Sequence, residues 1–153
     1  MKKDIKLYNA LFPLWMILAF PWYFILAVLP GNFLIDSIVL FVVMHCFKIA
    51  SQGKWDFYKR HIFKIFGFGL LSDVTGAVFM FGAGFCLPGI VRLWDEPIIT
   101  VPGIIIASGL IYFFNFRFTF KSIAERKMRI KLALIFAIAT APYTFVVPSE
   151  LLY

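Results

Sequence analysis

Two aspartates stand inside segments that otherwise have the composition of lipid-spanning helices. Asp36 lies in NFLIDSIVL (32–40), and Asp73 lies in GLLSDVTGAV (69–78). A charged side chain in the hydrocarbon of a bilayer is costly, so it normally faces a protein interior or a watery cavity. The two aspartates therefore predict an ion or proton site, or polar contacts along a translocation path.

A structural role is the alternative for both aspartates. Each carboxyl group would then be protonated or hydrogen-bonded to a neighbouring hydroxyl or backbone group, and it would only hold two helices together. The hydroxyl groups nearest in the sequence belong to Ser37, Ser72 and Thr75. The sequence alone leaves both interpretations open.

Helical spacing indicates which faces these residues occupy. Asn32 and Asp36 are four residues apart, so they share a face and form a polar pair near the outer end of their span. Asp73 belongs to a stripe of mostly small residues, which is expected to face a neighbouring helix. The stripe consists of Gly69, Asp73, Gly76, Met80 and Gly84. At about 1.5 Å per residue, Asp36 would lie about 7 Å from the outer end of its span and Asp73 about 16 Å from the inner end of its own, so they need not meet.

The composition is that of a membrane protein. Of the 153 residues, 62% are hydrophobic and only 15% are charged, with a mean hydropathy of +0.90. Soluble domains carry about 25% charged residues. The net charge of +7 does not predict nucleic-acid binding, because no basic soluble domain is present to carry it. We expect no cofactor and no metal site, since the sequence has no close cluster of His and Cys.

Five apolar runs are long enough to cross the roughly 30 Å of bilayer hydrocarbon. They predict an all-α integral membrane protein with one membrane domain over residues 1–153. A tight turn at LPGN (29–32) separates the first two spans, Pro97 fits the first turn of the fourth, and Pro142 lies inside the fifth. The first run follows lysines as in a signal peptide but is interpreted as an uncleaved span. The predicted spans cover about 7–29, 31–49, 62–87, 97–114 and 130–147.

The distribution of Lys and Arg predicts the orientation of the chain. All of them except Arg92 fall in the amino-terminal segment, or in and directly beside the loops after the second and fourth spans. Loops rich in Lys and Arg stay on the cytoplasmic side. We therefore expect a cytoplasmic amino terminus, an outside carboxyl terminus and a bacterial-type inner membrane. Cys46 and Cys86 would then lie on opposite sides of the membrane, where they cannot form a disulfide.

The basic segment after the fourth span, RFTFKSIAERKMRIK (117–131), is a second candidate for binding. Arg117, Lys121 and Arg126 could contact the phosphate of a lipid-linked substrate or a cytoplasmic partner. The simpler interpretation is that this segment follows the positive-inside rule and touches anionic lipid head groups. Either way the expected partners are the lipid bilayer and its anionic head groups.

No catalytic motif of a common membrane enzyme is present. The chain contains no GxSxG, HExxH or GxGD sequence. His45 is assigned to the cytoplasmic interface and His61 to the basic loop. We do not expect an enzyme.

The stretch from FGFGLLSDVTGAVFM to YFFNFRFTFK, about residues 66–120, resembles part of the GtrA-like family of small multi-span membrane proteins. Asp73 matches an acidic position of that family, and Asn115, Phe118 and Phe120 match the pattern that closes its second span. The family usually has four spans, whereas two extra spans precede the matching region here and one follows it. The resemblance implies a role in moving polyprenyl-phosphate-linked sugars.

These observations predict a small transport or translocation protein for a lipid-linked or small ionic substrate. Asp73, Asp36 and Asn32 would lie along its path. A chain with five short helices can enclose only a small path, so a homo-oligomer or a membrane partner protein is expected. The alternative is a non-catalytic accessory or scaffold subunit of a larger membrane complex.

Overall fold

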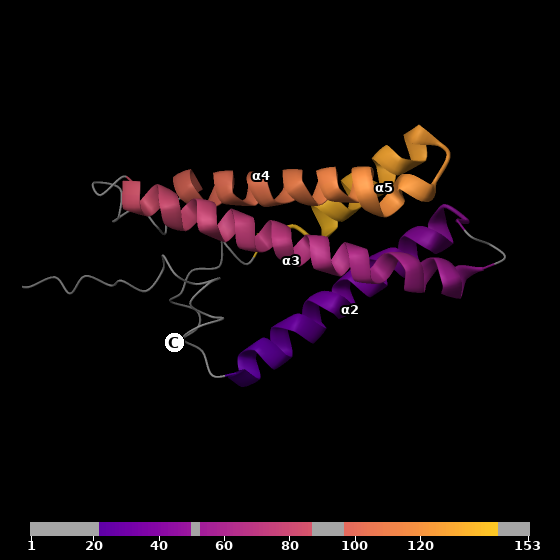
Figure 1. Ribbon diagram of the computed structural model, residues 1–153, viewed down its shortest axis with the longest axis horizontal. Coiled ribbons are helices and arrows are strands. Elements are labelled where there is room, and N and C mark those ends of the chain that lie inside the picture. The colour runs from indigo at the N-terminus through magenta and orange to yellow at the C-terminus, as the bar shows by residue number, and fades with distance from the viewer. Residues whose placement is uncertain (1–21, 50–52, 87–96, 144–153) are drawn as a thin grey trace, which may run out of the picture.

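The computed structural model describes residues 22–49, 53–86 and 97–143, and within these ranges all regular structure is helical (Figure 1). The predicted all-helical architecture is thereby confirmed. The elements in chain order are α2 (Trp22–Cys46), α3 (Lys54–Cys86), α4 (Pro97–Phe114), a five-residue π-helix η2 (Asn115–Thr119), a short 3₁₀-helix η3 (Phe120–Ser122) and α5 (Arg126–Ala139).

Three helical segments are long and apolar enough to cross a membrane, so the chain is a multi-pass membrane protein. They are Leu29–Cys46, Lys54–Met80 and Thr100–Ser122. Large apolar side chains cover much of the outer surface, as contact with lipid requires. The most exposed of them are Leu34, Phe63, Ile105 and Ile138.

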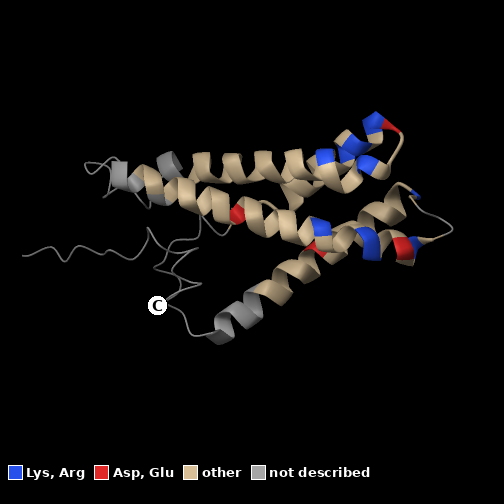
Figure 2. Ribbon diagram, in the orientation of Figure 1, with Lys and Arg blue, Asp and Glu red and all other residues tan. Residues whose placement is uncertain are grey.

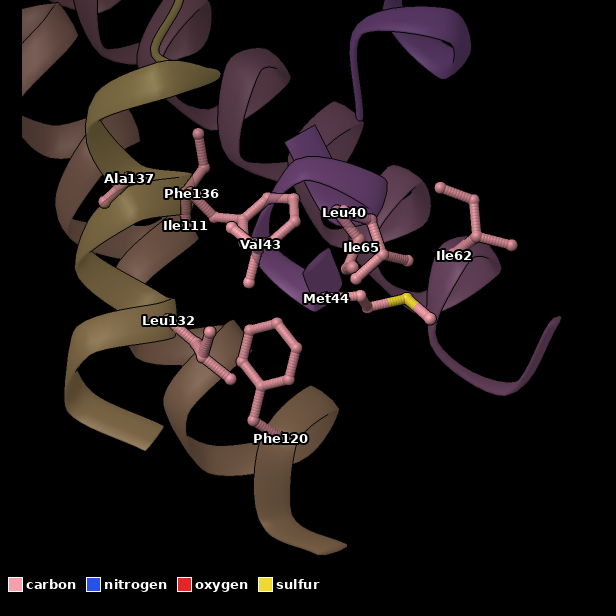
Figure 3. Close-up of a cluster of buried hydrophobic side chains, with 10 residues drawn as sticks. All are labelled: Leu40, Val43, Met44, Ile62, Ile65, Ile111, Phe120, Leu132, Phe136 and Ala137. Carbon is pink, nitrogen blue, oxygen red and sulfur yellow. The ribbon is translucent and has the colours of Figure 1, made fainter. Parts of the chain in front are cut away.

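Helices α3 and α4 pack against each other as the central pair, and α2 and α5 pack against this pair. Figure 1 shows α3 and α4 side by side along most of their length, with α2 crossing α3 obliquely. The shorter helix α5 contacts α4 and α2. A hydrophobic core joins all four helices at the end where α2 stops and α3 starts (Figure 3). Its buried members are Leu40, Val43, Met44, Ile62, Ile65, Ile111, Phe120, Leu132, Phe136 and Ala137.

The small-residue stripe of α3 faces a neighbouring helix, as its spacing predicted. Met80 lies against Gly103 of α4 so closely that a β-carbon on Gly103 would be 2.6 Å from Met80 Cγ. The backbone carbonyl of Gly76 is 3.7 Å from the same point. Ala107, one turn further along α4, is fully buried. Glycine at position 103 therefore lets the two backbones approach.

The turn predicted at 29–32 is wrong, because α2 continues through these residues to Cys46. Pro30 lacks only the one backbone donor that would have bonded to the carbonyl of Leu26. Transmembrane helices tolerate such a loss because neighbouring groups satisfy the freed carbonyl. The part of the predicted first span before Trp22 lies outside the described residues.

The helix predicted at 97–114 is present, whereas the helices predicted for the third and fifth spans have different limits. Helix α4 has the predicted bounds. Helix α3 begins at Lys54 instead of residue 62, so its first two turns carry the basic residues that had been assigned to a loop. At 33 residues it is about 50 Å long, longer than a perpendicular crossing needs.

The fifth helix is shorter than predicted. It runs over Arg126–Ala139, 14 residues or about 21 Å, and ends before Pro142. Proline disfavours helical geometry in the residue before it, here Ala141, which explains the early end. The remainder of the predicted span, from residue 144, lies outside the described residues.

Candidate functional site

Asp36 projects from α2 into its crossing with α3. Its side chain is only 6% exposed, and its Oδ2 atom lies 3.9 Å from the position that a β-carbon on Gly69 would take. Gly69 has no side chain, so the carboxyl group of Asp36 can lie directly against the backbone of α3. The glycine stripe of α3 thus contacts α2 at Gly69 and α4 at Met80.

Asp73 lies one helical turn from Gly69 on the same side of α3, a rise of about 6 Å. Its Oδ1 atom is buried and has no hydrogen-bond partner among the described residues. Asp36 and Asp73 therefore lie on the same side of α3, at Gly69 and one turn beyond it. We call this region, formed by Asp36, Gly69 and Asp73, the acidic site.

The shallow depth expected for Asp36 within its helix is wrong. That expectation assumed a span starting near residue 31. Because α2 begins at Trp22, Asp36 is about 21 Å from the start of the helix and about 15 Å from its end at Cys46. Asp36 is therefore a mid-helix residue, opposite the middle of α3.

Neighbouring hydroxyl groups do not donate to the carboxylates. The Oγ atom of Ser37 donates to the carbonyl of Phe33 at 2.7 Å, and the Oγ atom of Ser72 donates to that of Phe68 at 2.7 Å. Thr75 bonds the carbonyl one turn before it in the same way. Each hydroxyl has a single proton, and here that proton is used within its own helix. These contacts weigh against a purely structural role in which the three hydroxyl groups neutralise the aspartates.

The other predicted path residue, Asn32, is half-buried on α2, one turn before Asp36. Arg117, Lys121 and Arg126 are all exposed and lie together where α4 passes through η2 and η3 into α5. Figure 2 shows that Lys and Arg gather at this same end of the helices, together with the start of α3. We call it the basic end. The other Lys and Arg of the described residues lie there as well, except Lys64, which is about 15 Å along α3 from its start.

The basic end contains a second polar cluster that was not predicted from the sequence. Arg129 of α5 donates from Nη2 to the carbonyl of Phe116 at 2.9 Å, and its guanidinium lies 4.7 Å from the centre of the Phe116 ring. Asn115 and Thr119, in the π-helix, are buried and each has one side-chain oxygen without a partner. The sequence held a signal, since Arg129 shares a helical face with Leu132 and Phe136.

The residues that carried the family resemblance are partly buried here. Asn115 and Phe120 are fully buried, and Asn115 donates from Nδ2 to the carbonyl of Ile111 at 2.9 Å. Phe118 is 48% exposed, on the surface of the bundle. π-Helical turns within α-helices are rare and occur frequently at functional sites.

The two histidines differ in burial. His45 is exposed at the end of α2. His61 is buried in α3, not placed in a loop as predicted: its Nδ1 lies 2.7 Å from the carbonyl of Phe57 and its Nε2 lies 3.2 Å from the Ser122 hydroxyl. Nδ1 faces a carbonyl and so carries a proton. His61 therefore joins α3 to η3.

No family model, curated protein or solved structure matches this chain. Within the ranges that the structure describes, no three His, Cys, Asp or Glu side chains are placed to hold a metal ion together. The acidic site and the basic end are therefore interpreted from their own geometry.

Proposed function

We propose that this chain is a small membrane transport or translocation protein in which Asp36 and Asp73 hold a proton or small cation on the path. The observation that carries the proposal is the acidic site itself. The Asp36 carboxyl group of α2 lies against Gly69 of α3, and Asp73, one turn further along α3, has a buried carboxyl oxygen without a hydrogen-bond partner among the described residues. Acidic residues inside membrane helices most often mark ion pathways and proton relays. Asn32 would continue the polar path along α2.

The cationic side chains of the basic end favour a transported substrate that carries an anionic group. Arg117, Lys121 and Arg126 are exposed there and free to turn toward a phosphate. Such a substrate would be a lipid-linked molecule, which is what the resemblance to the GtrA-like family implies, or a small ion. Proton or cation binding at the acidic site would offset the negative charge that moves with it.

The proposed arrangement in the membrane extends the three spans already described to five. The amino terminus and the basic end would face the cytoplasm of a bacterial cell, because Lys and Arg are retained on that side. The chain would not be an enzyme, and it would assemble as a homo-oligomer or with a membrane partner. Anionic lipid head groups would surround its basic end.

Reconstitution tests this proposal. We expect the purified chain in lipid vesicles to be active in at least one of two assays: proton flux reported by an enclosed pH-sensitive dye, or flipping of a fluorescent polyprenyl phosphate. Asp73→Asn and Asp36→Asn should each reduce the active flux by at least about tenfold, because an amide cannot carry the charge that an intramembrane carboxylate supplies. Asp56→Asn is the matched control, since Asp56 is exposed in the first turn of the same helix α3.

Two results would contradict the transport proposal. The first is full activity of both Asp→Asn variants. The second is a wild-type chain that is inactive in both assays but co-purifies in mild detergent with a second protein at fixed stoichiometry, which would favour the accessory-subunit alternative.

A further inference from the structure

A dry core separates the acidic site from the basic end along the α2 and α3 interface. Leu40 and Met44 on α2 pack with Ile62 and Ile65 on α3, and none of these four side chains is more than 1% exposed. Figure 3 shows them lying between the two helices. An ion or a proton cannot pass through close-packed hydrocarbon, so the direct line between the acidic site and the basic end is closed.

One polar contact between α2 and α3 interrupts this apolar interface. The hydroxyl of Tyr58, in the second turn of α3, lies 3.0 Å from Ser37 Oγ. Ser37 follows Asp36 directly in α2, and both side chains are buried. Because the only proton on Ser37 Oγ is donated to the carbonyl of Phe33, Tyr58 is the donor in this contact.

The surroundings of Tyr58 fix its ring near the start of α3, where Lys54, Lys59 and Arg60 lie in the sequence. The ring stacks on Phe41 of α2 with 4.7 Å between centroids, and on Trp55 with 5.3 Å. The ammonium group of Lys59 lies 5.2 Å from the centre of the Trp55 ring. Tyr58 itself is half-buried. Tyr58 therefore belongs to the basic first turns of α3, while its hydroxyl group reaches a buried serine beside Asp36.

We infer that the Tyr58–Ser37 pair is the polar connection through which ions or protons reach the acidic site from the basic end. This inference rests on the proposed function of Asp36 and Asp73 and adds a positioning residue to it, Tyr58. His61 does not belong to this connection, because its ring contacts η3 through Ser122 and stacks on Phe57 and Phe120. The hydroxyl group of Tyr58 gives water a polar group to bind at the edge of the dry core.

Removing either hydroxyl should seal the connection. In Tyr58→Phe the ring can still stack on Phe41 and Trp55, but Ser37 loses its donor and the apolar surface becomes continuous. Water leaves narrow passages with apolar walls, and ions then stop passing. In Ser37→Ala the hydroxyl group of Tyr58 loses its hydrogen-bond acceptor.

Thiol accessibility tests the inference without any transport assay. The background is the full chain with Cys46→Ala and Cys86→Ala, and the probe is Ag⁺ applied to one face of membrane vesicles carrying Asp36→Cys. Lys121→Cys in the same background marks the basic face, since Lys121 is exposed there. We expect Ag⁺ to block the thiol at position 36 from the basic face, and at least about tenfold more slowly when Tyr58→Phe or Ser37→Ala is added, as for a dewetted passage.

Ser72→Ala is the matched control. Like Ser37, Ser72 is a buried serine that donates to the carbonyl four residues before it, but it has no tyrosine partner. Ser72→Ala should change the rate at which Ag⁺ blocks the thiol at position 36 by less than about twofold, because a lost hydrogen bond inside one helix changes little else.

Three results would overturn the inference: reaction from the opposite face only, no reaction from either face, or an unchanged rate in Tyr58→Phe. Failure of the proposed function has a different signature. If Asp36→Asn and Asp73→Asn keep full flux while Tyr58→Phe still slows Ag⁺, the connection exists but does not serve transport.

Discussion

The double variant Asp36→Asn/Asp73→Asn is expected to have the same flux as the less active of the two single variants. If the two carboxyl groups hold one proton or cation together, loss of either one disables the site, and loss of the second has nothing left to remove. The effects of substituting groups that act as a unit are strongly non-additive in this way. We expect each single variant to lose at least about tenfold and the double variant to match the lower of them within about twofold.

Independent sites would give a different result. Two separate polar contacts would each lower the flux by their own factor, and the double variant would show the product, about a hundredfold for two tenfold losses. The same vesicles and assay serve for all variants, with Asp56→Asn as the control for a change of surface charge on α3. A multiplicative result would contradict a shared site.

Gly103→Leu is expected to lower the free energy of unfolding by about 1–3 kcal/mol, because overpacking forces side chains and backbone apart. A β-carbon alone would already meet Met80 Cγ at 2.6 Å and Met80 Sδ at 2.7 Å. Adding Met80→Ala should restore part of the loss, since it empties the space that the new side chain needs. Unfolding by a denaturing detergent in mixed micelles would measure both.

Gly109→Leu on the same helix is the control for the Gly103 substitution. A β-carbon on Gly109 would meet nothing within 4 Å, and the residue is exposed. Its replacement should change the free energy of unfolding by less than about 0.5 kcal/mol. Equal losses at positions 103 and 109, or no rescue by Met80→Ala, would contradict the close approach of α3 and α4.

Local signals predicted the helices and their faces well. The limits of α4 follow from Pro97, which suits a first helical turn, and from the apolar run that ends at Phe114. The burial of Met80 and Gly103 follows from small residues at helical spacing. These features depend on a few neighbouring residues, which is why they can be read from the chain itself.

Features that depend on the relation between helices were missed. Pro30 was interpreted as a turn because its effect depends on whether tertiary packing supports the helix around it, and α2 continues through it. That single error placed Asp36 at the outer end of a span. The meeting of Asp36 with Gly69 depends on where α2 crosses α3, and a crossing point has no periodicity in the sequence.

The cluster at the basic end was hidden for a similar reason. Lys and Arg residues are abundant from 117 to 131, and composition alone cannot separate Arg129 from its exposed neighbours. What distinguishes it is the carbonyl of Phe116 in the π-helix, to which it donates. Helical spacing indicates the inward face of Arg129, but a π-helix leaves little trace in the amino-acid composition, so its partner was not predictable.

A thiol-bridging measurement tests most directly whether α2 and α3 form one acidic site. In the background with Cys46→Ala and Cys86→Ala, Asp36→Cys is combined either with Gly69→Cys or with Leu71→Cys. Leu71 lies two residues from Gly69 on α3 and is 50% exposed. Dibromobimane becomes strongly fluorescent when it bridges two nearby thiols. The acidic site predicts bridging between positions 36 and 69 but not between 36 and 71. Bridging of 36 to 71, or no bridging of 36 to 69 while both thiols remain reactive, would contradict it.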